Sequence, residues 1–312
     1  MTISDAAIAA AAREARIATL PLERVGPESG FFRGTASSIR DIFGRRELLW
    51  LLVKREVRAK YKDSSLGLVW SLFRPIIQLL IYYFAIGQIL GAARTVPDFG
   101  IFVFIGLTMW GLFNEIITQS TSAIINNAGL VKKVYLPREI FPLSGIGSAL
   151  FNFGVQVLVL VVATVILSDF AVTPDLLLAP LAILTLVVFS TAIGLTLAAI
   201  NVYLRDTQHL VELAIMVLFW ASPVVYSFTF VHNALAGNWI EQVYLSNPVT
   251  ICIIAMQRAL WTAGSTATGD FAQAWPDDLV LRLLITLVVG LVLLWISQRV
   301  FSRLQGNFAQ EL

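Results

Sequence analysis

The sequence contains few charged residues, one cysteine and two histidines, and each shortage excludes a class of protein. Only 13% of its 312 residues are Asp, Glu, Lys or Arg, whereas a soluble domain has about 25%. Cys252 is alone, so the chain can form neither an internal disulfide nor a two-cysteine metal motif. His209 and His232 are too few for a histidine-based metal site. We therefore expect no metal centre in this chain.

Apolar residues take the place of the missing charges. They make up 57% of the chain, the mean hydropathy is +0.79, and apolar runs close to membrane-spanning length recur. A helix needs about 20 apolar residues to cross a bilayer, whereas strands of a membrane barrel alternate in polarity. We predict an all-α polytopic membrane protein with six transmembrane helices. The predicted spans are 70–91, 99–121, 143–167, 176–201, 210–226 and 279–300.

One further apolar run, TICIIAMQRALW at 250–261, is too short to be a seventh span. Its 12 residues cover about 18 Å as a helix, against roughly 30 Å of hydrocarbon, and they include Arg258. Asn247-Pro248 precedes the run and Gly264 follows it. We predict a re-entrant or surface helix within an outer segment near 227–276.

The distribution of basic residues predicts the orientation. The first 62 residues hold 12 of the 22 Lys and Arg, and cytosolic flanks are enriched in these residues. With both termini in the cytosol, six spans place most of the remaining basic residues there and most loop aspartates outside. A seventh span would move Arg299 and Arg303 outside, against this rule.

The N-terminal part divides into two segments before the six-span domain at 66–312. Residues 1–44 form a polar extension to which the sequence assigns no role. Residues 45–65 contain RRELLWLLVKREVRAKY, in which apolar residues precede Arg55, Arg58 and Lys60. This pattern predicts an amphipathic helix at the inner membrane surface. A plain basic flank to the first span is the alternative.

The stretch NNAGLVKKVYLPREIFP, residues 126–142, lies in the cytosol between the second and third predicted spans. A short helix stopped by Pro137 is expected, lying flat and displaying Val131, Tyr135 and Leu136 beside Lys132 and Lys133. Exposed apolar residues next to cations are typical of a docking surface. An ordinary basic turn between spans would have a similar composition.

Arg74, Glu115 and Glu212 are charged residues that fall within predicted spans on the cytosolic side. A lone charge at such depth costs several kcal/mol and is usually paired or faces water. Our hypothesis is that Arg74 pairs with Glu115 or Glu212 near the inner membrane face. In the alternative, Arg74 and Glu212 reach the lipid headgroups separately. Glu115 is deeper and its side chain is short, so it needs a partner.

Aromatic residues gather near the predicted mid-membrane depth, away from the interfaces where aromatic belts lie. Tyr hydroxyls at this depth need a hydrogen-bond partner or a watery path, so these aromatic residues are candidates for a substrate path. Packing or lipid contact is the alternative for each. The candidates are Tyr82, Tyr83, Trp110, Phe113, Phe219 and Trp220.

Catalytic patterns are missing from the sequence. No Ser-His-Asp set can be assembled, and the phosphate-binding pattern G-x-x-x-x-G-K-[ST] does not occur. A membrane-embedded glycosyltransferase would need clustered acids, for which Asp277-Asp278 is the only candidate, and capping explains that pair. A proton-coupled carrier would need a chain of buried acids, and Glu115 alone is weak support.

Four motifs, in this order and spacing, resemble the permease subunits of ABC-2 type exporters, specifically the polysaccharide branch. They are LLVKREVRAKYKDSSLGLVWSLFRPI, NNAGLVKKVYLPREIFPLS, FWASPVVYSFTFV followed by YLSNPVTICIIAMQRALWTAG, and the tail FSRLQGNFAQEL. The resemblance covers about residues 45–312. It implies a bacterial inner-membrane or plasma-membrane protein that exports a lipid-linked glycan. An ABC-2 drug or lipid exporter is the alternative.

The resemblance also implies partners and roles. Two copies of the chain would work with two separate ATPase subunits, which would hold ATP and Mg²⁺, and we expect membrane lipids but no nucleic acid as further partners. Spans one and five would border the substrate path at the dimer interface. Arg55, Arg58 and Lys60 would receive the carrier diphosphate or anchor the helix to acidic lipids. The ATPase would grip a coupling helix near 126–140, through Leu130, Val131, Lys132, Lys133, Tyr135, Leu136 and Arg138.

Overall fold

The computed structural model describes residues 33–61, 69–133, 136–168 and 170–312, and the regular secondary structure in these ranges is entirely helical. The first half of the chain contains α2 (Arg33–Gly44), α3 (Arg46–Tyr61), α4 (Val69–Tyr82), the π-helix η1 (Tyr83–Ile89), α5 (Phe99–Asn126), α6 (Ala128–Lys133) and α7 (Ile140–Leu167). The second half contains η3 (Pro174–Leu177), α8 (Leu178–Tyr203), α9 (Thr207–Trp220), α10 (Phe228–Leu235), α11 (Trp239–Leu245), α12 (Pro248–Leu260), α13 (Thr262–Ser265), α14 (Leu279–Leu304), η5 (Gln305–Asn307) and α15 (Phe308–Glu311).

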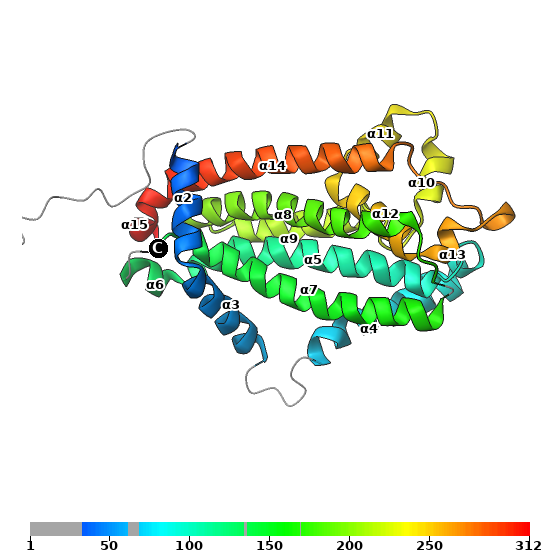
Figure 1. The fold of residues 1–312 in the computed structure, drawn as a ribbon, viewed down its shortest axis with the longest axis horizontal. Coiled ribbons are helices and arrows are strands. Elements are labelled where there is room, and N and C mark those ends of the chain that lie inside the picture. Colours follow the sequence, from blue (N-terminus) through cyan, green and yellow to red (C-terminus); the bar gives the residue numbers. More distant parts are fainter. Residues whose placement is uncertain (1–32, 62–68, 134–135, 169) are drawn as a thin grey trace, which may run out of the picture.

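The long helices form a bundle in which α5 is central. It packs against both α7 and α8, and α14 packs on the other side of α8 (Figure 1). Helices α10 to α13 gather at the end of the bundle opposite the C-terminus, whereas α2, α6 and α15 lie at the C-terminal end. The two ends are therefore built from different kinds of segment.

Four described helices are long and apolar enough to cross a membrane: α5, α7, η3–α8 and α14. They coincide with four of the six predicted spans. The other two predicted spans correspond to the shorter apolar helical segments Pro75–Ile89 and Thr207–Trp220. The fifth predicted span was placed too far along the chain, since α9 ends at Trp220 and not near 226. The six-span topology stays a prediction.

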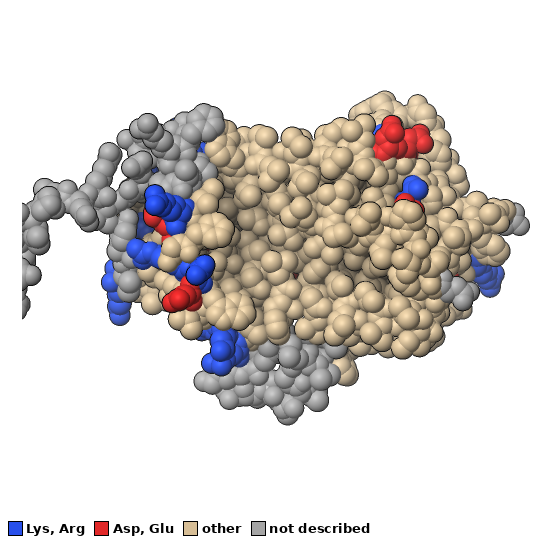
Figure 2. Space-filling view, viewed as in Figure 1, with Lys and Arg blue, Asp and Glu red and all other residues tan. Residues whose placement is uncertain are grey.

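Charge separates the bundle into three zones. On the face shown in Figure 2, charged side chains gather toward both ends and leave an uncharged band between them. Basic residues dominate the end that carries α6, as the excess of Lys and Arg in the N-terminal part predicts. An uncharged band with a basic side is the pattern expected of a protein embedded in a bilayer.

The short apolar run at 250–261 folds as α12, which forms a bent pair with α11. The two helices meet at 79°, and the Asn247 side chain caps α12 by accepting a hydrogen bond from the Val249 N–H. At the other end of α12, the Trp261 indole donates to the carbonyl of Pro97, just before α5 begins. Both helices thus belong to the end opposite the C-terminus, and the re-entrant course of this segment stays a prediction.

At the C-terminal end, α6 is held by the last residues of the chain. Val131 is 6% exposed and packs in a cluster with Phe308, whose ring also contacts the Arg138 guanidinium. Burial raises the pKa of Glu139, an effect partly offset by a hydrogen bond from Gln305. The expectation that α6 displays Val131 is wrong, because this side chain anchors the helix. Lys132 and Lys133 are exposed.

Candidate functional site

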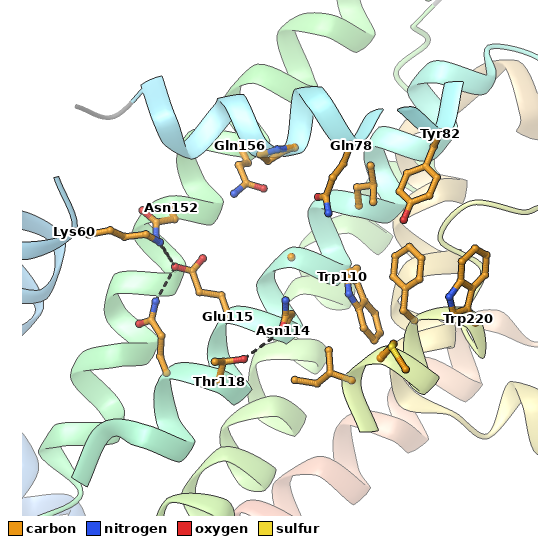
Figure 3. Close-up of a pocket in the computed structure, with 17 residues that line it drawn as sticks. Lys60, Gln78, Tyr82, Trp110, Asn114, Glu115, Thr118, Asn152, Gln156 and Trp220 are labelled. Atoms are coloured by element: carbon orange, nitrogen blue, oxygen red, sulfur yellow. Dashed lines mark hydrogen bonds and ion pairs between the residues drawn. The ribbon is translucent and has the colours of Figure 1, made fainter. Parts of the chain in front are cut away.

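A groove of about 800 Å³ runs along one face of α5, between α4, α7 and α9. The two short apolar segments, α4–η1 and α9, therefore form walls of the groove (Figure 3). Its polar lining consists of Lys60, Gln78, Asn114, Glu115, Thr118, Gln119, Asn152 and Gln156. Its aromatic lining consists of Tyr82, Trp110, Phe219 and Trp220.

Helix periodicity explains why the polar side chains meet. Asn114 and Glu115 are followed one turn later on α5 by Thr118 and Gln119, so the four share one side of the helix. Asn152 and Gln156 are likewise one turn apart on α7. These polar stripes are visible in the sequence, but our sequence analysis selected only Glu115. The missed signal was the recurrence of polar side chains one helical turn apart in two neighbouring spans.

Glu115 lies at the centre of the polar half. Its Oε1 accepts hydrogen bonds from Lys60 Nζ at 2.6 Å, Asn152 Nδ2 at 2.5 Å and Gln119 Nε2 at 2.8 Å. The Glu115 side chain is 18% exposed and that of Lys60 is 43% exposed. The carboxylate is thus paired, as a charge at this depth requires.

Glu115 has a partner that the sequence analysis did not name, and its predicted pairing with Arg74 stays untested. Lys60 reaches it from the end of α3, whereas our hypothesis named Arg74, whose side chain lies outside the described residues. Glu212 lies 3.9 Å from His209 on the exposed surface of α9. Helix α3 delivers Lys60 because it packs closely across α7: a methyl group on Gly147 would lie 2.6 Å from Val53 Cγ2.

Four of the six aromatic candidates meet in the other half of the groove. The Tyr82 and Phe219 rings are stacked with centroids 6.0 Å apart, and Phe219 lies edge-on to Trp110 and Trp220 at 5.4 Å each. Figure 3 shows Tyr82, Trp110 and Trp220 at the end of the groove remote from Lys60. Aromatic rings from α4, α5 and α9 therefore form one continuous surface.

The other two aromatic candidates lie elsewhere. Phe113 is 3% exposed and packs beside Trp110 at a centroid distance of 5.4 Å, so it supports the groove without lining it. Tyr83 lines a separate cavity on another face of α4. Residues 82 and 83 are adjacent on a helix and point about 100° apart, so only one of them faces the groove.

A second cavity, of about 530 Å³, continues the groove toward α6. Lys60 and Gln119 line both cavities, and the second is otherwise rich in small hydroxyl and amide side chains. Arg55 lies at this end, where it donates to Glu56 and to Asn127, each at 2.6 Å. A polar path thus connects the end of the bundle near α6 to the aromatic surface.

The remaining predicted residues lie toward the ends of the bundle. Arg58, Leu130, Lys132 and Lys133 are exposed, while Leu136 and Arg138 are half-buried. Tyr135 lies outside the described residues. Asp278 precedes α14, and its carbonyl accepts from the Arg282 N–H. The described ranges contain no cluster of three or more His, Cys, Asp or Glu side chains suited to a metal ion.

Comparison with known proteins connects this arrangement to transport. Residues 47–261 match the family described as ABC-2 type transporter. The O-antigen export system permease protein RfbA of Myxococcus xanthus is 28% identical over 274 residues, covering 88% of this chain and 98% of that protein. A Klebsiella pneumoniae protein of the same name is 26% identical over 269 residues, covering 85% and 95%. The polysialic acid transport protein KpsM of Escherichia coli is 25% identical over 248 residues, covering 78% and 90%.

Proposed function

This chain belongs to the ABC-2 type transporter family, and from that premise we propose that it is the membrane subunit of an ATP-driven polysaccharide exporter. Its substrate is a glycan attached to a lipid carrier, moved from the cytosolic to the outer face of the membrane. The relatives named for O-antigen and polysialic acid support a polysaccharide as cargo. A separate subunit supplies ATP hydrolysis, because this chain contains no phosphate-binding loop.

The groove on α5 is the observation that carries the proposal. Amide and carboxylate groups hydrogen-bond to sugar hydroxyls, and aromatic rings cover the C–H faces of sugars. The groove offers both along one continuous wall, from Glu115 and Asn152 to Trp110 and Trp220. A lipid or drug exporter would favour an apolar lining, so this composition supports the glycan over those alternatives.

A homodimer would close the groove. Helix α9 exposes most of its apolar side chains, including Leu213 and Val217, and α4 exposes Ile77 and Ile81. These two helices are the walls of the groove and would meet their counterparts in a second copy. Paired grooves would then enclose one path for the glycan, shielded from lipid by α4 and α9.

Energy would enter through α6. Lys132 and Lys133 are exposed there beside Leu130, and Val131 fixes the helix to the bundle from beneath. An anchored helix with a cationic outer face suits docking to an ATPase subunit, because force on it is transmitted to the bundle. If α6 lies on the cytosolic side of the inner or plasma membrane, both termini lie on that side too.

The basic end of α3 would contact the diphosphate of the carrier or the acidic headgroups of the inner leaflet. Lys60 already donates a hydrogen bond to Glu115. Arg55 already donates to Glu56 and to Asn127. Arg58 is exposed and carries this role most directly.

Purification of the chain from its native membrane in mild detergent tests the proposal. We expect an ATPase with a phosphate-binding loop to copurify in equal amount, as identified by mass spectrometry. Lys132→Glu/Lys133→Glu should release it by reversing the charge of α6. Lys54→Glu, an exposed lysine on α3, is the matched control and should retain it. Recovery of folded wild-type chain with no ATPase would contradict the proposal.

A further inference from the structure

We propose that Glu115 is the acceptor for a hydroxyl group of an uncharged sugar ring, and that the groove thereby selects neutral glycans over polyanionic ones. This inference rests on the proposed function and specifies the substrate class. The relatives leave the class open, because one is named for O-antigen and another for an acidic polymer, polysialic acid.

Charge balance in the groove is the first argument. Among the described residues, the charged ones that line the two connected cavities are Arg55, Glu56, Lys60 and Glu115. They form two ion pairs, each with an N–O distance of 2.6 Å, so their charges cancel. A polyanion requires cations that are not already neutralised. Among the described lining residues, none meets this requirement.

The geometry of Glu115 is the second argument. Its three described donors, from Lys60, Gln119 and Asn152, all converge on Oε1. Figure 3 shows the other carboxylate oxygen, Oε2, pointing away from Lys60. A carboxylate held by three donors is fixed in orientation, and a charged acceptor forms stronger hydrogen bonds than a neutral one. A sugar hydroxyl is a suitable donor, whereas a sugar carboxylate would be repelled.

The surroundings of Glu115 fit a flat ring. Gly111 lies one turn before it on α5, and a methyl group there would meet only Gln156 Oε1, at 3.7 Å. The groove floor is therefore low between Glu115 and Trp110. A sugar resting on this floor would place one edge near Glu115 and Gln156 and its C–H face toward Trp110.

Depletion of the chain in its native cell tests the substrate class. Lipid-linked glycans that accumulate would be extracted, released from the carrier by mild acid and separated by anion exchange. We expect a polymer that passes through the column unretained. A retained polymer carrying carboxylate or phosphate groups would overturn the inference while leaving the exporter intact. Accumulation of no polymer would instead overturn the proposed function.

Variants of Glu115 test the residue itself. Glu115→Gln removes the charged acceptor, and we expect export of the native glycan to fall about tenfold, the effect of one charge-assisted hydrogen bond. Glu47→Gln, at an exposed glutamate in the first turn of α3, is the matched control and should export normally. Normal export by Glu115→Gln would overturn the role assigned to Glu115.

A double variant separates binding from folding, because Glu115→Gln leaves Lys60 without its ion-pair partner. Lys60→Gln/Glu115→Gln removes both charges and keeps the groove neutral. We expect it to melt near the wild-type temperature and still to export about tenfold more slowly, since the acceptor is missing. If the double variant restored normal export, Glu115 would serve only to neutralise Lys60, and the inference would fail.

Discussion

Helices α5 and α14 have similar lengths, yet the more apolar of the two is the more exposed. In its most apolar window, α5 has a mean hydropathy of 1.7 and 78% of that window is buried, whereas α14 has 2.8 and 17%. In a soluble protein this order would be reversed, because burial follows hydrophobicity. The two helices therefore have different surroundings. Other protein segments surround α5, whereas most of α14 faces the hydrocarbon of the bilayer.

The packing of each helix explains the difference. Helix α14 contacts α8 through a narrow seam, in which Leu283, Gly290 and Ser297 recur every seven residues. Helix α5 is surrounded by other segments and can carry Glu115 and three polar neighbours, because protein groups pair with them. In a bilayer, helix association depends on close packing and interhelical hydrogen bonds more than on apolar burial. The central helix is thus the one that can carry polar functional side chains.

The largest expected contrast is between two glycines. A methyl group at Gly106 on α5 would lie 2.5 Å from the Val224 carbonyl oxygen, so the backbone must shift. At Gly290 on α14 the nearest atom is Val188 Cγ1 at 3.3 Å, on a side chain that can move. We expect Gly106→Ala to lower the free energy of unfolding by about 3 kcal/mol and Gly290→Ala by about 0.5 kcal/mol. Unfolding titrations in mixed micelles would measure both, and equal losses would refute the contrast.

An intermediate contrast comes from removing apolar side chains. Ile105 on α5 is fully buried, whereas Val288 on α14 is 60% exposed. We expect Ile105→Ala to cost about 2 kcal/mol because it leaves a cavity, and Val288→Ala to change stability by less than about 0.5 kcal/mol because lipid replaces the lost contacts. The same titrations would decide, and a large loss at Val288 would indicate a protein contact on that face.

The smallest contrast concerns the hydrogen bonds of α8. Asn201 donates to the Thr121 carbonyl of α5 at 2.8 Å in a buried position, while Thr196 donates to Ser297 of α14 at 2.9 Å. We expect Asn201→Ala to cost about 1 kcal/mol and Ser297→Ala about 0.5 kcal/mol, since Thr196 keeps its bond to the Ala192 carbonyl. Thermal melting of the purified variants would show whether this order holds.

Much of the architecture could be predicted because hydropathy and local signals act over short stretches of sequence. The long apolar runs predicted α5, α7, α8 and α14, and Asn247-Pro248 marked the start of α12. The early end of α9 at Trp220 was missed, because the apolar sequence continues past it to Pro223-Val224-Val225. Gly106 closely contacts Val224, so tertiary packing rather than local preference fixes the turn there.

The candidate site was predicted in part. Glu115 and four of the six aromatic candidates line the groove, because charges and Tyr or Trp at mid-membrane depth are unusual in any span. Lys60 had been considered only for headgroup contact, since nothing in the sequence connects it to a residue 55 positions away. The sequence did not show which of Tyr82 and Tyr83 faces the groove, because an apolar run does not indicate which side of the helix contacts protein.

The sequence by itself determined that this chain is helical and built for a membrane, and its motifs identified the family. Those properties depend on composition and on short ordered patterns, which folding does not alter. Only the tertiary structure decided that α3 carries Lys60 to Glu115, that α4 and α9 form walls of the groove, and that Val131 is an anchor. These depend on how each helix is rotated and where it crosses its neighbours, which side-chain packing fixes and hydropathy does not encode.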